Sequence, residues 1–181
     1  METETKQRLA AELLEQHGES FDVDIPKALA AFFASGGAFN CEGKCAKLSV
    51  PGWQPGTFRL VVAPPSWEVA SEINVDDAIV GEDGEWEAAR NFVPLFNVDE
   101  SSYIVAKIDE PGVPVGFFNE EAFREDGKGY KNGVFMIAKS LADFRESLVD
   151  VAGEADFECE IEDEIWDELD DDEDDDDEED D

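Results

Sequence analysis

The stretch from Phe92 to Asn119 constrains the fold most, because it predicts three short strands joined by two turns. From Ser102 to Ile108 apolar and mixed positions alternate. Successive side chains of a strand point to opposite faces, so this strand has one dry face and one mixed face. Glu110-Pro111-Gly112 supplies turn chemistry, because Pro fixes φ and Gly tolerates a positive φ. The stretch therefore predicts the centre of an antiparallel sheet.

Two helices are predicted before this sheet. Thr5 to His17 has apolar residues at helical spacing, and Gly18 follows as the residue after the helix end. His17 is the only histidine of the chain, and a capping or surface role is favoured for it over that of a catalytic base. A second helix is expected to open on an Asp N-cap within Asp22 to Pro26 and to end at Ser35 to Gly37.

Further strands and a last helix complete the predicted fold. Strands are expected at Lys47 to Val50, Thr57 to Ala63 and Val134 to Ala138. Ser140, with Asp143 three residues on, resembles a capping box and starts the last helix. The fold class predicted is α+β, a mostly antiparallel sheet with helices packed against it in a single domain.

Net charge is the strongest compositional signal. The 181 residues include 48 Asp and Glu against 13 Lys and Arg, a net charge of −35. Glu154 to Asp181 holds 21 acidic and no basic residues, so Met1 to Gly153 carries a net charge of −14. Phosphate binding needs clustered Lys and Arg, so this charge argues against a nucleic acid partner and favours a basic protein. A solubility device explains the charge of the body equally well.

The chain divides into three parts on composition. Residues 1–153 are expected to form the folded domain, and residues 170–181, which are purely acidic, a disordered tail. Residues 154–169 have an apolar residue at every fourth position and form an acidic amphipathic helix or an added edge strand. We expect this segment to dock on its own body, with docking on a partner as the alternative. The candidate docking residues are Phe157, Ile161, Ile165 and Trp166.

The loop-rich stretch from Pro64 to Ala89 sets large aromatic residues among acidic ones. Trp is over-represented at interface hot spots, and carboxylates on an interface rim steer a cationic partner. The alternative is that both Trp rings cover an edge of the core. The candidate partner-binding residues are Trp67, Glu82, Asp83, Glu85, Trp86 and Glu87.

Neither the cysteines nor the search for known catalytic motifs indicates a metal site or an enzymatic activity. Cys41 and Cys45 could form half of a zinc site, but such a site needs four ligands and the third thiol, Cys159, lies far along the chain. The sequence contains no GxSxG, no HExxH and no recognisable Cys–His pattern. We therefore expect no metal, no cofactor and no enzymatic activity.

The distribution of apolar residues gives no sign of a membrane partner. No apolar run approaches the roughly 20 residues that cross a bilayer. The start of the sequence, METETKQRLA, lacks the apolar region of a signal peptide. We expect a cytoplasmic protein with reduced thiols.

Three sequence patches, spread over roughly residues 5 to 152, give the chain a family resemblance. The first patch is Ile25-Pro26 with Gly36-Gly37. The second is Pro94 to Asn97 with Tyr103 to Ile108 and Pro114 to Phe118. The third is Val134 to Ala138 with Ser140 to Phe144. In their order and spacing these patches resemble the SUKH superfamily. The acidic tail and the long insertion between Gly37 and Pro94 depart from a plain domain of that family.

The resemblance implies helices packed on a mostly antiparallel sheet and a non-enzymatic, protein-binding role. Many bacterial members are immunity proteins that neutralise toxins, often nucleases, and fungal members regulate cell-wall synthesis. The expected function is that of an immunity protein that occludes the active surface of a basic toxin, for example a nuclease. The alternative is an acidic regulatory or chaperone-like adaptor that binds basic proteins through its C-terminal tail.

Overall fold

The computed structural model describes residues 2–51, 53–65, 90–99, 102–119, 134–150, 155–156 and 166. The elements are α1 (Thr3–Phe21), α2 (Lys27–Ala34), the 3₁₀ helix η1 (Phe39–Cys41), β1 (Cys45–Leu48), β2 (Gly56–Arg59), β3 (Val61–Val62), β4 (Phe92–Asp99), β5 (Ser102–Lys107), β6 (Val115–Asn119), β7 (Val134–Ala138) and α6 (Leu141–Ser147). None of the helices in these ranges has the length and apolar character that a bilayer crossing needs. The fold is α+β, which confirms the predicted class.

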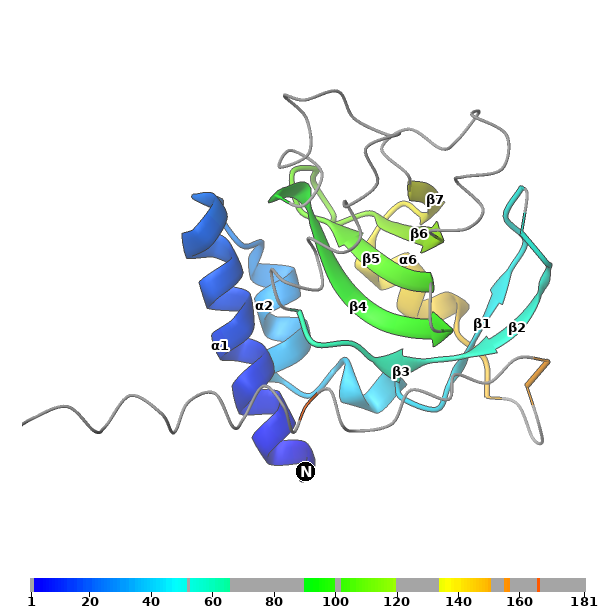
Figure 1. Ribbon diagram of the computed structural model, residues 1–181, viewed down its shortest axis with the longest axis horizontal. Coiled ribbons are helices and arrows are strands. Elements are labelled where there is room, and N and C mark those ends of the chain that lie inside the picture. The colour runs from blue at the N-terminus through cyan, green and yellow to red at the C-terminus, as the bar shows by residue number, and fades with distance from the viewer. Residues whose placement is uncertain are drawn as a thin grey trace, which may run out of the picture.

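The strands form two antiparallel sheets. The larger sheet has the order β3-β4-β5-β6-β7, and β1 pairs with β2 in a separate hairpin. Figure 1 shows α1 and α2 side by side at one side of the molecule, the β1–β2 hairpin at the other, and the sheet between them. An isolated bridge between Cys45 and Val149 ties the hairpin to the residues that follow α6.

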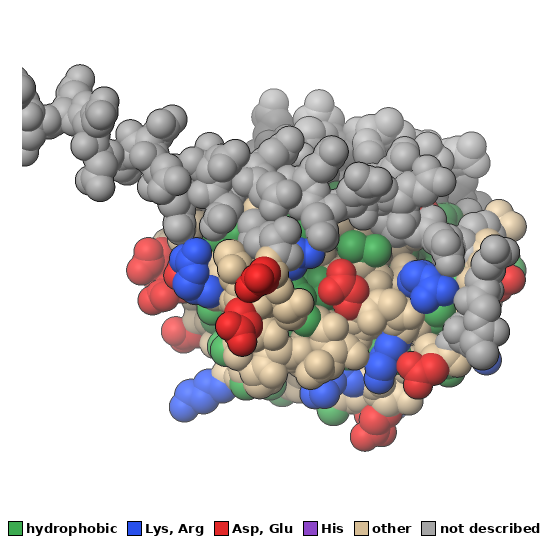
Figure 2. All heavy atoms as spheres, turned by 90° about the horizontal axis from the view of Figure 1, so that it is seen from below, with side chains coloured by type: hydrophobic (Ala, Val, Ile, Leu, Met, Phe, Trp, Pro, Cys, Tyr) green, Lys and Arg blue, Asp and Glu red, His purple; other side chains and the backbone are tan. Residues whose placement is uncertain are grey.

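One face of the described part of the chain is mixed in charge, although the whole chain is strongly acidic. On the face shown in Figure 2, lysine and arginine side chains lie among aspartates and glutamates. Arg8 pairs with Glu12 at 3.0 Å on α1, and Lys107 pairs with Asp109 and Glu110 after β5. Neighbouring opposite charges largely cancel each other's field at a distance. The negative charge on this face is therefore partly cancelled by its own lysine and arginine side chains.

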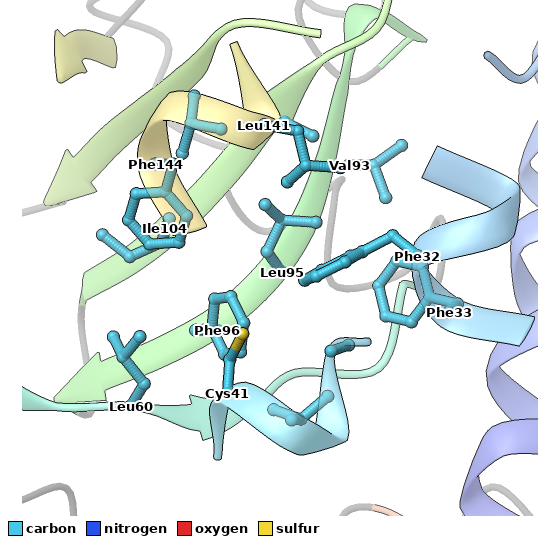
Figure 3. Close-up of a cluster of buried hydrophobic side chains, with 14 of the residues drawn as sticks. Phe32, Phe33, Cys41, Leu60, Val93, Leu95, Phe96, Ile104, Leu141 and Phe144 are labelled. Carbon is cyan, nitrogen blue, oxygen red and sulfur yellow. The ribbon is translucent and has the colours of Figure 1, made fainter. Parts of the chain in front are cut away.

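The main core lies between one face of the larger sheet and the helices. Figure 3 shows side chains from α2, η1, β4, β5 and α6 converging on one another. The ring of Phe96 on β4 lies 6.3 Å from that of Phe32 on α2 and 6.0 Å from that of Phe144 on α6, between centroids. Phe96 therefore joins both helices to the sheet.

An irregularity in β4 makes this arrangement possible. The pairing with β5 shifts between Pro94 and Phe96, so Leu95 is an extra residue on β4. Side chains normally alternate between the faces of a strand, but this bulge lets Leu95 and Phe96 both enter the main core. It also accommodates Pro94, which has no N–H to donate to a sheet. The backbone N–H of Ala63 bonds to the Leu95 carbonyl at 3.0 Å and so keeps β3 attached there.

The opposite face of the sheet carries a smaller apolar cluster. The predicted dry face of the 102–108 strand is correct, because Ile104, Ala106 and Ile108 all lie in the main core. The other face is less polar than expected, since Val105 is fully buried there with Phe92.

The turn after β5 helps to start α6. Gly112, at a φ of 84°, supplies the positive φ expected for the turn that begins at Glu110. Its carbonyl accepts a hydrogen bond from the N–H of Leu141, the first residue of α6, at 3.2 Å. The hydroxyl of Ser140 accepts a second from the N–H of Asp143 at 3.0 Å, which confirms Ser140 as the N-cap. Two of the unpaired N–H groups at this helix start are thus satisfied.

Replacing the N-cap tests this local account. Ser140→Ala removes the acceptor for the Asp143 N–H and should lower the free energy of unfolding by about 1 kcal/mol. Ser140→Asp restores an acceptor and should recover most of the loss. Urea unfolding followed by far-ultraviolet circular dichroism measures both. Equal stability of the Ala and Asp variants would contradict the capping role.

Candidate protein-interaction surface

The predicted partner-binding residues cannot be placed by the structure. Trp67, Glu82, Asp83, Glu85, Trp86 and Glu87 all lie outside the described residues. Of the predicted docking residues of the C-terminal segment, Phe157, Ile161 and Ile165 also lie outside them, and Trp166 is described.

Trp166 is buried against the body of the protein, with 2 % of its surface exposed. Its indole N–H donates a hydrogen bond to the carbonyl of Val62 on β3 at 3.3 Å. Its ring centroid lies 5.9 Å from that of Phe39 on η1 and 6.0 Å from the ammonium nitrogen of Lys6 on α1. Trp166 thus contacts α1, η1 and β3, which all lie in the N-terminal half of the chain, and it belongs to the main core.

A second contact of the C-terminal segment involves Asp156. Its carboxylate accepts a hydrogen bond from the backbone N–H of Thr57 on β2 at 2.9 Å. Together with Trp166 it attaches this acidic segment to the β2–β3 region at two points. The indole of Trp166 therefore makes its contacts within the protein itself.

The end of α1 differs from the sequence prediction. The helix continues through Gly18 to Phe21, and Asp22 takes the left-handed conformation at a φ of 50°. The N–H groups of Asp22 and Val23 bond to the carbonyls of Glu19 and Gly18, as in a Schellman motif. Asp tolerates this conformation better than most residues, which is why a Gly is not needed there.

The beginning of α2 also differs. Its N-cap is Pro26, not an Asp, and no side chain caps it. The Pro26 carbonyl accepts the N–H of Ala30 at 3.0 Å, so the helix begins directly after it. Asp22 and Asp24 are therefore not used as caps, and both side chains are exposed.

A groove lies between the two helices and includes their connection. Its volume is about 660 Å³, within the range of ligand clefts in proteins. A Cβ at Gly18 would lie only 3.1 Å from Cγ1 of Ile25, so the absence of a side chain at Gly18 leaves room for Ile25. The apolar lining comprises Ala11, Leu14, Val23, Ile25, Ala30 and Ala34. The acidic lining comprises Glu15, Glu19, Asp22 and Asp24.

The negative charge of this groove is not balanced by positive side chains among the described residues that line it. Its four carboxylates face no lysine or arginine among the described lining residues, and they form no ion pair within the described part of the chain. A neighbouring hollow of about 430 Å³ shares Asp22 and Asp24 but also contains Arg90. The guanidinium of Arg90 donates to the Asp22 carbonyl at 3.4 Å. The α1–α2 groove is therefore the better candidate site for a cation.

His17 is a core residue, which corrects the expectation of a capping or surface role. It is fully buried, and its ring lies 4.9 Å from that of Phe21. Neither ring nitrogen has a well-formed hydrogen bond in the described part of the chain. Burial lowers the pKa of His17 below its ordinary value of 6.5, and the nearby Arg90 backbone partly opposes this. The imidazole is thus held neutral and inaccessible to a substrate.

The described thiols also show no arrangement for catalysis or metal binding. Cys41 and Cys45 are both buried. Burial raises the pKa of the Cys41 thiol, against opposing effects of Arg145 and Lys44. A buried thiol with a raised pKa is a poor nucleophile. Among the described residues no group of His, Cys, Asp and Glu side chains could hold a metal ion.

Comparisons of the chain with family models, with curated proteins and with solved structures found no match.

Sequence reasoning missed the groove, although one signal was present. Residues 27–34, KALAAFFA, contain a single polar residue, Lys27. A helix that is apolar all round is usually covered on every side. In the structure Leu29, Phe32 and Phe33 are buried, while Ala30 and Ala34 on the other side are exposed in the groove.

The burial of Trp166 generates a stability prediction. Trp166→Ala should lower the free energy of unfolding by about 3–5 kcal/mol, because it leaves a cavity in the core. A chain that ends after Trp166 should retain the stability of the full chain, since it keeps the ring and loses only acidic residues and Leu169. Urea unfolding followed by circular dichroism compares the three proteins. An unchanged midpoint for Trp166→Ala would show that the ring is not part of the core.

The burial of His17 predicts a pH dependence with a definite sign. Below pH 6.5 the unfolded chain takes up a proton that folded His17 resists. Stability therefore falls as pH drops from 6.5 toward the lowered folded-state pKa, by up to about 1.4 kcal/mol per pH unit, and is unaffected above that window. His17→Met lacks this contribution. The difference in unfolding free energy between the two proteins, measured from pH 8 to 5, should change only below about pH 6.5; parallel curves would contradict the prediction.

Proposed function

We propose that this chain is a non-catalytic protein-binding module for a basic partner. Specifically, we propose an immunity protein that neutralises a basic toxin, for example a nuclease, by covering its active surface. The observation that carries the proposal is the α1–α2 groove, where four carboxylates lie beside an apolar floor. Such a combination suits a protein partner, because apolar contact supplies affinity and charge complementarity supplies orientation and association rate.

The buried positions of the reactive side chains support a binding role. His17 is enclosed in the core, and the thiols of Cys41 and Cys45 are buried. The net charge of −35 also favours a cationic partner. Toxins that act on nucleic acid commonly carry excess positive charge because their substrate is a polyanion. Trp67 and Trp86, with the acidic residues near them, remain candidates for additional contacts on sequence grounds.

The position of Trp166 bears on the alternative role, an adaptor that binds through its C-terminal tail. The indole of Trp166 contacts Val62 and Phe39 of its own chain. This aromatic residue would have to leave the core before it could contact a partner. The observation favours the body as the binding part and leaves to the tail a purely electrostatic contribution.

Binding of a basic protein tests the proposal. Calorimetric titration of the full chain with basic nuclease toxins, and co-expression with toxins encoded beside it, should show tight binding and neutralisation. The affinity should fall as salt is raised from 50 to 500 mM, because exposed charges are then screened. Failure to bind or neutralise any of these toxins would refute the immunity role.

Truncation separates the two candidate functions. A chain that ends after Trp166 keeps this core residue and loses 14 of the acidic residues. Toxin binding should persist in this variant with a reduced association rate and a weaker salt dependence. Complete loss of binding would favour the tail-dependent adaptor.

A further inference from the structure

We propose that the α1–α2 groove is the docking site for an amphipathic helix of the partner. The apolar stripe of that helix lies on the floor of the groove, and its lysine or arginine side chains face the acidic rim. The inference rests on the proposed protein-binding function and adds the surface and the chemistry of the bound segment.

The outer side of α2 has the character of a helix–helix contact. Ala30 and Ala34 are four residues apart, lie on one face and are exposed in the groove. Ala11 of α1 is exposed on the facing wall. Side chains this small let a third helix approach within the 8–10 Å typical of packed helix axes. Leu14, Val23 and Ile25 supply the larger apolar surface beneath.

The length of the groove suits a short helix. The lining residues of α1 and its cap run from Ala11 to Asp22. At 1.5 Å per residue this is roughly 17 Å, or three helical turns. A helix of that length presents apolar residues at i, i+3, i+4 and i+7 to the floor. An extended strand would gain nothing further here, because the helical walls offer no unpaired backbone edge.

The charge of the rim selects the occupant. Glu15 and Glu19 are four residues apart and follow one side of α1, and Asp22 and Asp24 close the end of the groove. All four side chains are exposed. A second copy of this chain that docked groove to groove would bring the same four carboxylates against them. Residues 154–181, which contain no basic residue, would also be repelled. A cationic helix from another protein is the occupant that complements this rim.

The test uses the full chain and a fluorescein-labelled helical peptide of about 14 leucine and lysine residues, with leucine at i, i+3, i+4 and i+7. A peptide of the same composition with the leucines scrambled is the control ligand. Fluorescence anisotropy in 150 mM salt should show binding of the amphipathic peptide at least about tenfold tighter than of the scrambled one.

Two pairs of variants locate the site. Ala30→Arg fills the groove, and Ala142→Arg adds the same charge at an exposed position of α6. Glu19→Lys reverses a rim charge, and Glu146→Lys makes the same reversal on α6. The groove variants should weaken peptide binding by about tenfold or more, and the α6 variants by less than about threefold. Circular dichroism and urea midpoints confirm that each variant is folded.

The outcomes distinguish this inference from the proposed function. Equal effects of the groove and α6 variants would overturn the docking site, since binding would then follow net charge alone. Binding of a basic toxin that is unchanged by Ala30→Arg would also overturn it and would leave the proposed function standing. Sedimentation that shows a groove-dependent dimer would identify a second copy as the occupant and would overturn the cationic helix. Absence of binding to both the peptide and every basic toxin would refute the proposed function itself.

Discussion

The packing of Phe96 is the contact on which the rest of the structure depends. Its ring touches Phe32 of α2 and Phe144 of α6, so one side chain holds an N-terminal and a C-terminal helix on the same sheet. The bulge at Leu95 creates this position by placing two consecutive residues of β4 in one core. Without it, regular alternation would turn Phe96 to the opposite face. Because α2 forms one wall of the α1–α2 groove, the contact that positions α2 also shapes this groove.

The net charge of the chain can be interpreted only together with its fold. From composition alone, we expect the chain to repel polyanions and attract cations. The structure shows that positive and negative side chains are interspersed on the face in Figure 2, and that four acidic residues gather at the α1–α2 groove. The difference arises because Arg8 and Lys107 form ion pairs with adjacent carboxylates, while the described residues that line the groove include no lysine or arginine.

Strands and the cap of α6 could be predicted from sequence because their signals are local. Alternation placed Ile104 and Ala106 in the core, and the Ser140 cap required only residues within one turn. The helix ends were predicted less well. Gly18 suggested a stop, but the left-handed residue is Asp22, since an Asp can take that conformation when the backbone bonds require it.

The groove could not be predicted, because it arises from the relative placement of two helices. No local pattern states that Ala11 will face Ala30, or that Ile25 will fill the space above Gly18. The apolar outer side of residues 27–34 indicates that a second face of this helix is covered, but the sequence does not identify what covers it. The burial of Trp166 beside Val62 likewise follows from contacts across more than a hundred residues.

The strand order has a consequence for how such a molecule could change its specificity. Residues 66–89 connect β3 to β4, and residues 120–133 connect β6 to β7, and in each case the two strands are paired neighbours. Sheet hydrogen bonds between β3 and β4, and between β6 and β7, therefore hold the strands that flank each connection. Insertions and exchanges can accumulate in these two connections while the framework keeps its register. One framework of paired strands can in this way carry connections of different sequence.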